Sequence, residues 1–116
     1  MRIQHLALQV RDPAQSRRFY LDTLGLHGEA VDEDWGVRVS FADGFMLALI
    51  RGEPVPEGAI DRVHFGCRLP DATAARAMRE RLADAAVVEI EWVDEPEYVS
   101  VKVRDPDGYI VELAYE

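Results

Sequence analysis

The sequence predicts an α+β fold made of two copies of a βαβββ module. Two pairs of matching segments indicate the duplication. HLALQVRD (5–12) and HFGCRLPD (64–71) each begin with a histidine and reach an aspartate seven residues later. FADGFMLAL (41–49) and DPDGYIVEL (105–113) each place an Asp-Gly turn directly before an apolar strand. Because the two halves start and end alike, we predict that both fold in the same way.

Each module is expected to run from a strand into a helix and then through three more strands. In the first module Asp12 and Pro13 form a helix start, and Gly25 marks its stop. In the second, Asp71 caps a segment rich in strong helix formers. The alternation of apolar and polar residues predicts the strands. The expected elements are strands at 3–10, 28–34, 36–42 and 45–50 with a helix at 13–24, then strands at 62–69, 87–93, 98–104 and 109–115 with a helix at 72–85.

A connector separates the two modules. RGEPVPEGAID (51–61) combines prolines, glycines and acidic residues and shows no periodicity, as is typical of a loop. The whole chain has 116 residues, of which 48% are hydrophobic, and this suits one packed domain. We therefore expect residues 1–116 to form a single domain of two modules, at about 1–52 and 61–116.

The acidic composition excludes several kinds of partner. A formal net charge of −9 disfavours nucleic acid, which proteins bind through clustered Lys and Arg.

No apolar run approaches the ~20 residues that cross a membrane, and the first residues lack the pattern of a signal peptide. The single cysteine, Cys67, forms no internal disulfide, which agrees with a reducing compartment. The expectation is a cytoplasmic protein that binds a small molecule or another protein.

The strand pattern also assigns side chains to faces of the sheet. Successive side chains of a strand point to opposite faces. In YVSVKVRD (98–105) the odd-numbered valines are expected to pack against a helix, which puts the polar residues between them on the other face. The same alternation brings His5, His64 and Glu112 onto that other face, and turns Cys67 away from it into the packing.

These three residues predict a metal site. Glu112 lies in the middle of an apolar strand, where a charge is costly unless it is paired or coordinates a cation. Two imidazoles and one carboxylate are typical ligands of a divalent transition metal. We therefore predict that His5, His64 and Glu112 hold such an ion. The alternative is that both histidines are ordinary residues of the sheet and that Glu112 is solvated.

Cations and a hydroxyl on the same face predict an anionic ligand. The candidate substrate-binding residues are Lys102, Arg38, Arg68 and Ser100, and Lys102 is the first among them because its strand neighbours that of Glu112. The alternative is that this face contacts solvent or a partner subunit. Four other side chains lie near strand ends or in loops: Tyr98, Trp35, Trp92 and His27. Each is expected either to close over the site as a lid or to be a rim residue or a core aromatic.

Four segments carry a resemblance to a known family. IQHLALQVRD, RRFYLDTLGL, RVHFGCRLPD and DPDGYIVELAYE resemble the vicinal oxygen chelate superfamily, which includes glyoxalase I, extradiol dioxygenases, fosfomycin-resistance enzymes and bleomycin-resistance proteins. The resemblance implies two βαβββ modules whose curved mixed sheets form a cup around a metal, the glyoxalase/bleomycin resistance/dihydroxybiphenyl dioxygenase fold. It places ligands on the first and last strand of each module. His5, His64 and Glu112 occupy three of these places, and Ala48 occupies the fourth.

The resemblance also implies a function. Glyoxalase I normally uses all four ligands, so Ala48 disfavours that activity, whereas extradiol dioxygenases and fosfomycin-resistance enzymes use two histidines and one carboxylate. The expectation is a metal-dependent lyase, transferase or dioxygenase that uses Fe, Mn, Ni or Zn, with Glu112 as the catalytic carboxylate. Ala7 stands where fosfomycin-resistance enzymes typically carry Thr, and extradiol dioxygenases are usually far longer, so neither match is complete.

Two further expectations follow from the resemblance. The alternative function is that of a bleomycin-resistance-type protein, which binds a small molecule without a metal and usually lacks the histidines. Short members often form homodimers by pairing modules of two chains. We therefore expect a homodimer in which each site is formed within one chain or shared between two.

Overall fold

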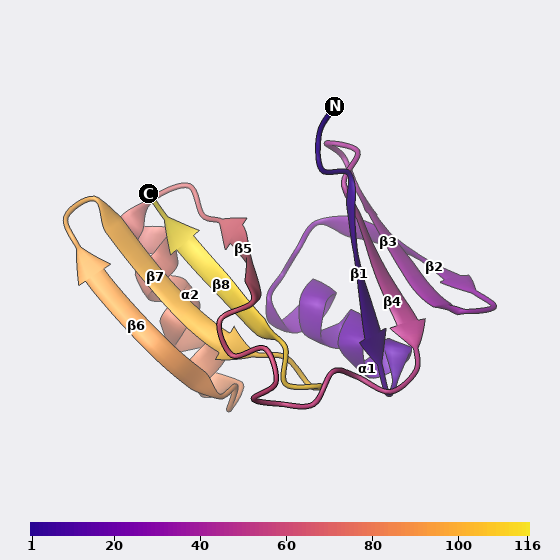
Figure 1. Cartoon of the computed structure of the whole chain (residues 1–116). Coiled ribbons are helices and arrows are strands. Elements are labelled where there is room, and N and C mark those ends of the chain that lie inside the picture. Colours follow the sequence, from indigo (N-terminus) through magenta and orange to yellow (C-terminus); the bar gives the residue numbers. More distant parts are fainter. The chain divides into compact units, whose positions relative to one another are not determined.

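The computed structural model describes residues 1–116 and divides them into two compact units, Met1–Val55 and Pro56–Glu116. Each unit contains one four-stranded mixed sheet, and the two sheets have the same topology (Figure 1). Their strand orders are β1-β4-β3-β2 and β5-β8-β7-β6, with the first and last strand of each unit paired in parallel. The predicted duplication of a βαβββ module is therefore confirmed.

The first unit begins its helix where the sequence predicts. The side chain of Asp12 accepts hydrogen bonds from the backbone N–H groups of Ala14 and Gln15, which is a typical N-cap. The helix then packs against β3 and β4. The elements of this unit are β1 (His5–Val10), α1 (Pro13–Arg18), the π-helix η1 (Phe19–Thr23), β2 (Gly28–Glu33), β3 (Gly36–Phe41) and β4 (Met46–Arg51).

The expected helix at 13–24 is α-helical only as far as Arg18. Its last turn is the wider π-helix η1, in which the N–H of Leu24 donates to the carbonyl of Phe19 at 2.8 Å. Phe19 and Tyr20 are both buried and meet edge to face, with ring centroids 5.1 Å apart. Within this wider turn both adjacent rings enter the core.

The second unit packs α2 on one face of its sheet, against β7 and β8 (Figure 1). Its elements are β5 (His64–Arg68), α2 (Ala72–Asp84), β6 (Glu89–Glu95), β7 (Tyr98–Arg104) and β8 (Ile110–Tyr115). The predicted alternation in β7 is confirmed, because its three odd-numbered valines are fully buried. No helix of the protein is long and apolar enough to cross a membrane.

The strand expected at 87–93 begins two residues later, at Glu89. The cause is the end of α2, where Ala86 adopts the left-handed conformation, with φ 57°. The N–H of Ala86 donates to the carbonyl of Ala83, and the N–H of Val87 to that of Leu82. This is the Schellman motif, which uses the residues directly after the helix to turn the chain. The motif usually has glycine where this protein has Ala86.

Replacing Ala86 with glycine is therefore expected to stabilise the protein by about 1 kcal/mol, since a left-handed residue with a Cβ costs about 1–2 kcal/mol. The matched control is Ala77→Gly, an exposed position inside α2, where the same change should destabilise by about 1 kcal/mol. Urea unfolding of both variants measures the two effects. Equal destabilisation at the two positions would contradict the assigned helix end.

The turn that precedes the last strand is also alike in the two units. Gly44 and Gly108 both have positive φ, at 87° and 92°. In the first turn the side chain of Asp43 accepts from the N–H of Phe45. In the second, one oxygen of Asp105 accepts from the N–H groups of both Asp107 and Tyr109. These local bonds fix the start of β4 and of β8, and so the register of the strand that carries Glu112.

Candidate functional site

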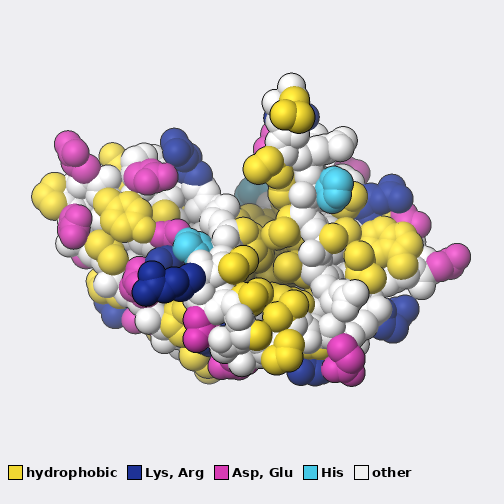
Figure 2. Space-filling view, viewed as in Figure 1, with side chains coloured by type: hydrophobic (Ala, Val, Ile, Leu, Met, Phe, Trp, Pro, Cys, Tyr) yellow, Lys and Arg dark blue, Asp and Glu magenta, His cyan; other side chains and the backbone are white.

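His64 and Glu112 come together on adjacent strands of the second unit. His64 begins β5, which pairs in parallel with β8. His64 lies opposite Ile110, and Glu112 follows Ile110 by two residues on the same strand. The His64 Nε2 atom is 3.2 Å from the Glu112 Oε2 atom. On the sheet face opposite α2, Figure 2 shows a histidine next to acidic and basic side chains. The structure therefore joins two of the three predicted metal ligands.

The imidazole of His64 faces an acceptor on each side. Its Nδ1 atom lies 3.1 Å from the carbonyl oxygen of Arg62, and its Nε2 atom faces the carboxylate of Glu112. A neutral imidazole carries only one N–H, so it cannot donate to both acceptors. A positive ion between Nε2 and Oε2, either a proton or a metal, satisfies both atoms. With the N–H at Nδ1, Nε2 is free to act as a ligand.

The other oxygen of Glu112 receives two hydroxyl groups from β7. Ser100 Oγ donates to Oε1 at 2.6 Å, and the hydroxyl of Tyr98 donates to the same atom. Burial has the largest single influence on the pKa of Glu112 and raises it. Hydrogen bonds from Ser100 and Tyr98 lower the pKa, and the charges of Lys102 and His64 act in the same direction. The net effect lowers the pKa of Glu112, so the carboxylate is ionised at neutral pH.

Tyr98 has a role that the sequence does not predict. The sequence favours a lid, a rim residue or a core aromatic at this position, whereas Tyr98 begins β7 and its hydroxyl bonds directly to Glu112. The hydrogen bond to Glu112 raises the pKa of the Tyr98 hydroxyl, because the anion holds its proton. A signal was present in the sequence: Tyr98, Ser100 and Lys102 alternate along one strand, and so share one face.

Lys102 lies directly opposite Glu112 in the register of β7 and β8. Its Nζ atom pairs with Glu91 on β6, 2.9 Å from Oε1. This hydrogen bond raises the pKa of Lys102, and the nearby charge of Glu112 adds to the effect. The lysine is therefore a fixed positive charge beside the Glu112 carboxylate, and its predicted contact with an anionic substrate stays a prediction.

The first unit contains the equivalent positions but a different set of side chains. Ala48 lies opposite Ala7 on β1 and opposite Arg38 on β3. In the second unit Glu112 lies opposite Gly66 on β5 and opposite Lys102 on β7. The register therefore confirms that Ala48 is the counterpart of Glu112, and it makes Arg38 the counterpart of Lys102.

His5 and Arg38 are described within the first unit. His5 begins β1 as His64 begins β5, and it is exposed. Arg38 pairs with Glu33, 2.6 Å from Oε1. Neither unit by itself groups three or more His, Cys, Asp or Glu side chains into a set that could hold a metal ion. The predicted third ligand, His5, thus remains a prediction.

Arg68 lies further along β5 than His64, on the other side of Gly66, the residue opposite Glu112. It is four residues from His64, or about 13 Å at the rise of a strand. Its side chain is 75% exposed, and its guanidinium is 3.8 Å from Glu116. In the same strand, burial raises the pKa of the Cys67 thiol, as expected of a cysteine packed on the helix side. The predicted role of Arg68 in binding substrate stays a prediction.

Known proteins share this architecture. A sequence model of the Glyoxalase/Bleomycin resistance protein/Dioxygenase superfamily matches residues 2–113. The chain belongs to this superfamily. No curated protein sequence matches it. The family assignment confirms the resemblance carried by the segments around His5, His64 and Glu112.

Three solved structures show how similar the fold is. A possible glyoxalase from Bacillus cereus is 24% identical, with 97% of each chain covered and a TM-score of 0.79. A fosfomycin resistance protein from Listeria monocytogenes is 17% identical, with a TM-score of 0.81 over 98% of this chain and 92% of that one. A lactoylglutathione lyase from Agrobacterium tumefaciens is 25% identical, with a TM-score of 0.74 over 97% and 92%. These structures share the fold of this superfamily member.

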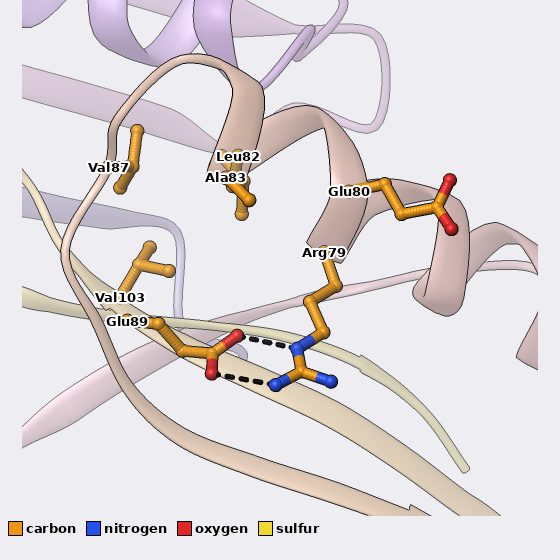
Figure 3. Close-up of a pocket in the computed structure, with 7 residues that line it drawn as sticks. All are labelled: Arg79, Glu80, Leu82, Ala83, Val87, Glu89 and Val103. Atoms are coloured by element: carbon orange, nitrogen blue, oxygen red, sulfur yellow. Dashed lines mark hydrogen bonds and ion pairs between the residues drawn. The ribbon is translucent and has the colours of Figure 1, made fainter.

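A pocket of about 370 Å³ lies elsewhere in the second unit, between α2 and strands β6 and β7 (Figure 3). Its apolar lining comes from Leu82, Ala83, Val87 and Val103, on the helix side of the sheet. Its two central charges pair with each other, since Arg79 donates to both oxygens of Glu89, at 2.8 and 3.0 Å. Glu80 also lines the pocket and points away from this ion pair (Figure 3). In this superfamily member the pocket lies on the helix side of the sheet, opposite the face that carries Glu112.

Two such arginine pairs tie α2 to β6. Arg76 donates to both oxygens of Asp94, at 3.0 and 2.8 Å, in the same way as Arg79 with Glu89. Arg79 also lies over the ring of Trp92, 4.4 Å from its centroid. The hydrogen bonds from these arginines lower the pKa of both carboxyl groups. Trp92 is thus part of the contact between helix and sheet rather than a lid.

These lowered pKa values predict a dependence of stability on pH. A carboxyl group whose pKa is lower in the folded state stabilises the protein above its unfolded pKa, and this contribution is lost as pH falls through the folded pKa. The double variant Glu89→Gln/Asp94→Asn should therefore melt below the wild type at about pH 7, and the difference should shrink as the pH falls below the ordinary carboxyl pKa values of about 4. Thermal unfolding across this range tests it. Glu97→Gln, in the turn after β6, is the control, and a difference that persists in acid would contradict the prediction.

Proposed function

We propose that the protein is a divalent-metal-dependent enzyme that acts on a small anionic substrate with two adjacent oxygens. His64, Glu112 and His5 are the proposed ligands. The observation that carries the proposal is the contact of His64 Nε2 with Glu112 Oε2, at 3.2 Å, on an imidazole that faces acceptors on both sides. Such an arrangement calls for a cation between the two atoms.

The donor atoms fit a metal ion. Ligands bind such an ion at about 2.0–2.2 Å, so two neighbouring ligand atoms lie about 3 Å apart. The separation of Nε2 and Oε2 matches that spacing. The carbonyl of Arg62 orients the ring through Nδ1, as the second nitrogen of a metal-bound histidine usually requires. Imidazole and carboxylate together suit iron, manganese, nickel or zinc.

His5 is proposed as the third ligand because of its place in the duplicated module. It begins β1 as His64 begins β5, and each of these strands pairs in parallel with the last strand of its unit. Ala48, the counterpart of Glu112, has no ligand atom, so the set contains one carboxylate. A set of two histidines and one carboxylate leaves coordination positions open to a substrate.

The bound metal would act as a Lewis acid that polarises substrate oxygens and stabilises negative charge beside them. The protein's own residues prepare the site. The charge of Lys102 attracts an anionic substrate group toward Glu112. Lys102 would then exchange its contact with Glu91 for one with the substrate. Ser100 and Tyr98 hold the carboxylate ionised and ready to bind the cation.

The superfamily and two of the compared structures suggest which substrates to test. The Agrobacterium protein is a lactoylglutathione lyase and the Listeria protein confers fosfomycin resistance. We propose that this protein acts on a compound of the same kind, a small molecule with neighbouring oxygens and a negative charge. We further propose a cytoplasmic homodimer, and light scattering on the purified protein measures its mass.

Elemental analysis of protein purified without chelator tests the proposal. One equivalent of a transition metal is expected in the wild type, and its loss is expected in the His5→Ala and His64→Ala variants. A screen of metals against glutathione hemithioacetals, catechols and fosfomycin then identifies the reaction. Full metal occupancy in the His5→Ala/His64→Ala double variant would reject the ligand assignment. Tight binding of small molecules by metal-free protein, with no turnover, would instead indicate a bleomycin-resistance-type function.

A further inference from the structure

The two oxygens of Glu112 have different surroundings. Oε1 accepts the hydroxyls of Tyr98 and Ser100, whereas Oε2 faces His64 Nε2. A carboxylate oxygen has two lone pairs, so two donors fill Oε1. Only Oε2 is then left for a cation. The division of roles between the two oxygens is built into the second unit alone.

The strands make this arrangement rigid. Lys102 is directly opposite Glu112, and Ser100 and Tyr98 follow at alternate positions of the same strand and on the same face. The side chain of Ser100 is buried, with 1% of the residue exposed, and that of Glu112 is 15% exposed. In such surroundings water competes weakly for Oε1, so hydroxyl donors hold the carboxylate in one orientation.

We propose that Tyr98 and Ser100 are positioning residues that make Glu112 a ligand through one oxygen only. By occupying Oε1 they prevent the carboxylate from binding a metal ion through both oxygens. They also aim Oε2 toward the ion that it shares with His64. A carboxylate that binds through two oxygens takes up two coordination positions. Binding through one oxygen leaves the second position open to water or substrate. This inference rests on the proposed metal-dependent function.

The test measures metal binding rather than turnover. The full-length wild type is compared with Tyr98→Phe, Ser100→Ala and the double variant, each loaded with Zn²⁺ or Co²⁺. Dissociation constants are measured by competition with a chromophoric chelator. Loss of partners that orient a ligand typically weakens metal binding about 10–100-fold, and we expect this range for the double variant. Tyr115→Phe, on β8, removes a hydroxyl from a different position and is the control.

The binding mode of Glu112 separates a positioning role from a general loss of structure. X-ray absorption of the loaded proteins should show a shorter distance from the metal to the carboxylate carbon in the double variant, because Glu112 is then free to bind through both oxygens in place of a water. Melting temperatures of the metal-free proteins identify any variant that fails to fold, and the single Tyr98→Phe change, which alters one atom, provides a second measurement.

The outcomes distinguish this inference from the proposed function. If the wild type binds metal and the double variant matches it in affinity and in the binding mode of Glu112, the positioning role is overturned and the metal site stands. Wild-type protein that binds no metal would overturn the proposed function, and the positioning role with it. Weaker binding together with a changed binding mode of Glu112 would support both.

Discussion

Replacing Glu112 with alanine is expected to lower the affinity of the protein for a divalent metal by about 100-fold or more. Substitution of groups that only orient a ligand already costs about 10–100-fold, and this change removes a proposed ligand atom itself. The loss should be at least as large for His64→Ala, whose Nε2 atom lies 3.2 Å from Glu112 Oε2. Calorimetric titration of metal-free protein with Zn²⁺ or Mn²⁺ measures both variants.

Alanine at 112 also leaves the hydroxyls of Tyr98 and Ser100 without their acceptor. Glu112→Gln keeps an oxygen for those donors, so its metal affinity separates loss of the ligand charge from loss of local structure. Glu116→Gln, at the exposed end of the chain, is the control for a general change of charge. Wild-type affinity in the Glu112→Ala variant would show that the metal binds elsewhere.

Replacing Leu113 with alanine is expected to destabilise the protein by about 2–5 kcal/mol, the usual cost of truncating a buried leucine. Leu113 is 1% exposed and lies opposite Cys67 on β5 and Val101 on β7. Its side chain points to the face covered by α2, so the truncation opens a cavity in the core of the second unit. Urea unfolding, analysed with a constant dependence on denaturant, measures the loss.

The control for Leu113 is Val88→Ala. Val88 is 61% exposed, and a surface change of this kind usually alters stability by less than about 0.5 kcal/mol. Under conditions in which Leu113→Ala remains folded, its metal affinity should stay close to that of the wild type, because Leu113 and Glu112 point to opposite faces. Similar losses of stability at positions 88 and 113 would contradict the assigned core.

Much of the second unit's site was predictable from the sequence. The alternation in β7 and β8 assigned Glu112 and Lys102 to one face, and the structure pairs them directly across the strands. The alignment of the two Asp-Gly turns identified Ala48 as the counterpart of Glu112, and the strand register agrees. These predictions succeed because a strand has a period of two, and because a tight turn fixes the register of the strands that it joins.

Other features needed the folded chain. Tyr98 has the correct alternation, but nothing in its neighbours along the sequence indicates that its hydroxyl reaches Glu112, fourteen residues away. The π-helical turn after Arg18, in which two adjacent rings enter the core, has no signal in the sequence pattern, which predicts one continuous helix. The left-handed Ala86 at the end of α2 departs from the preference for glycine, which is why the following strand was predicted two residues too early.

The sequence by itself determined the duplicated module, its helix starts, its two Asp-Gly turns and the face on which His64 and Glu112 lie. Each of these depends on residues close together in the chain, through capping, turn geometry or strand alternation. Only the tertiary structure decided which oxygen of Glu112 faces His64 and which one Tyr98 and Ser100 occupy. Those choices depend on side-chain orientations across three neighbouring strands, and packing between strands, rather than local sequence, selects among them.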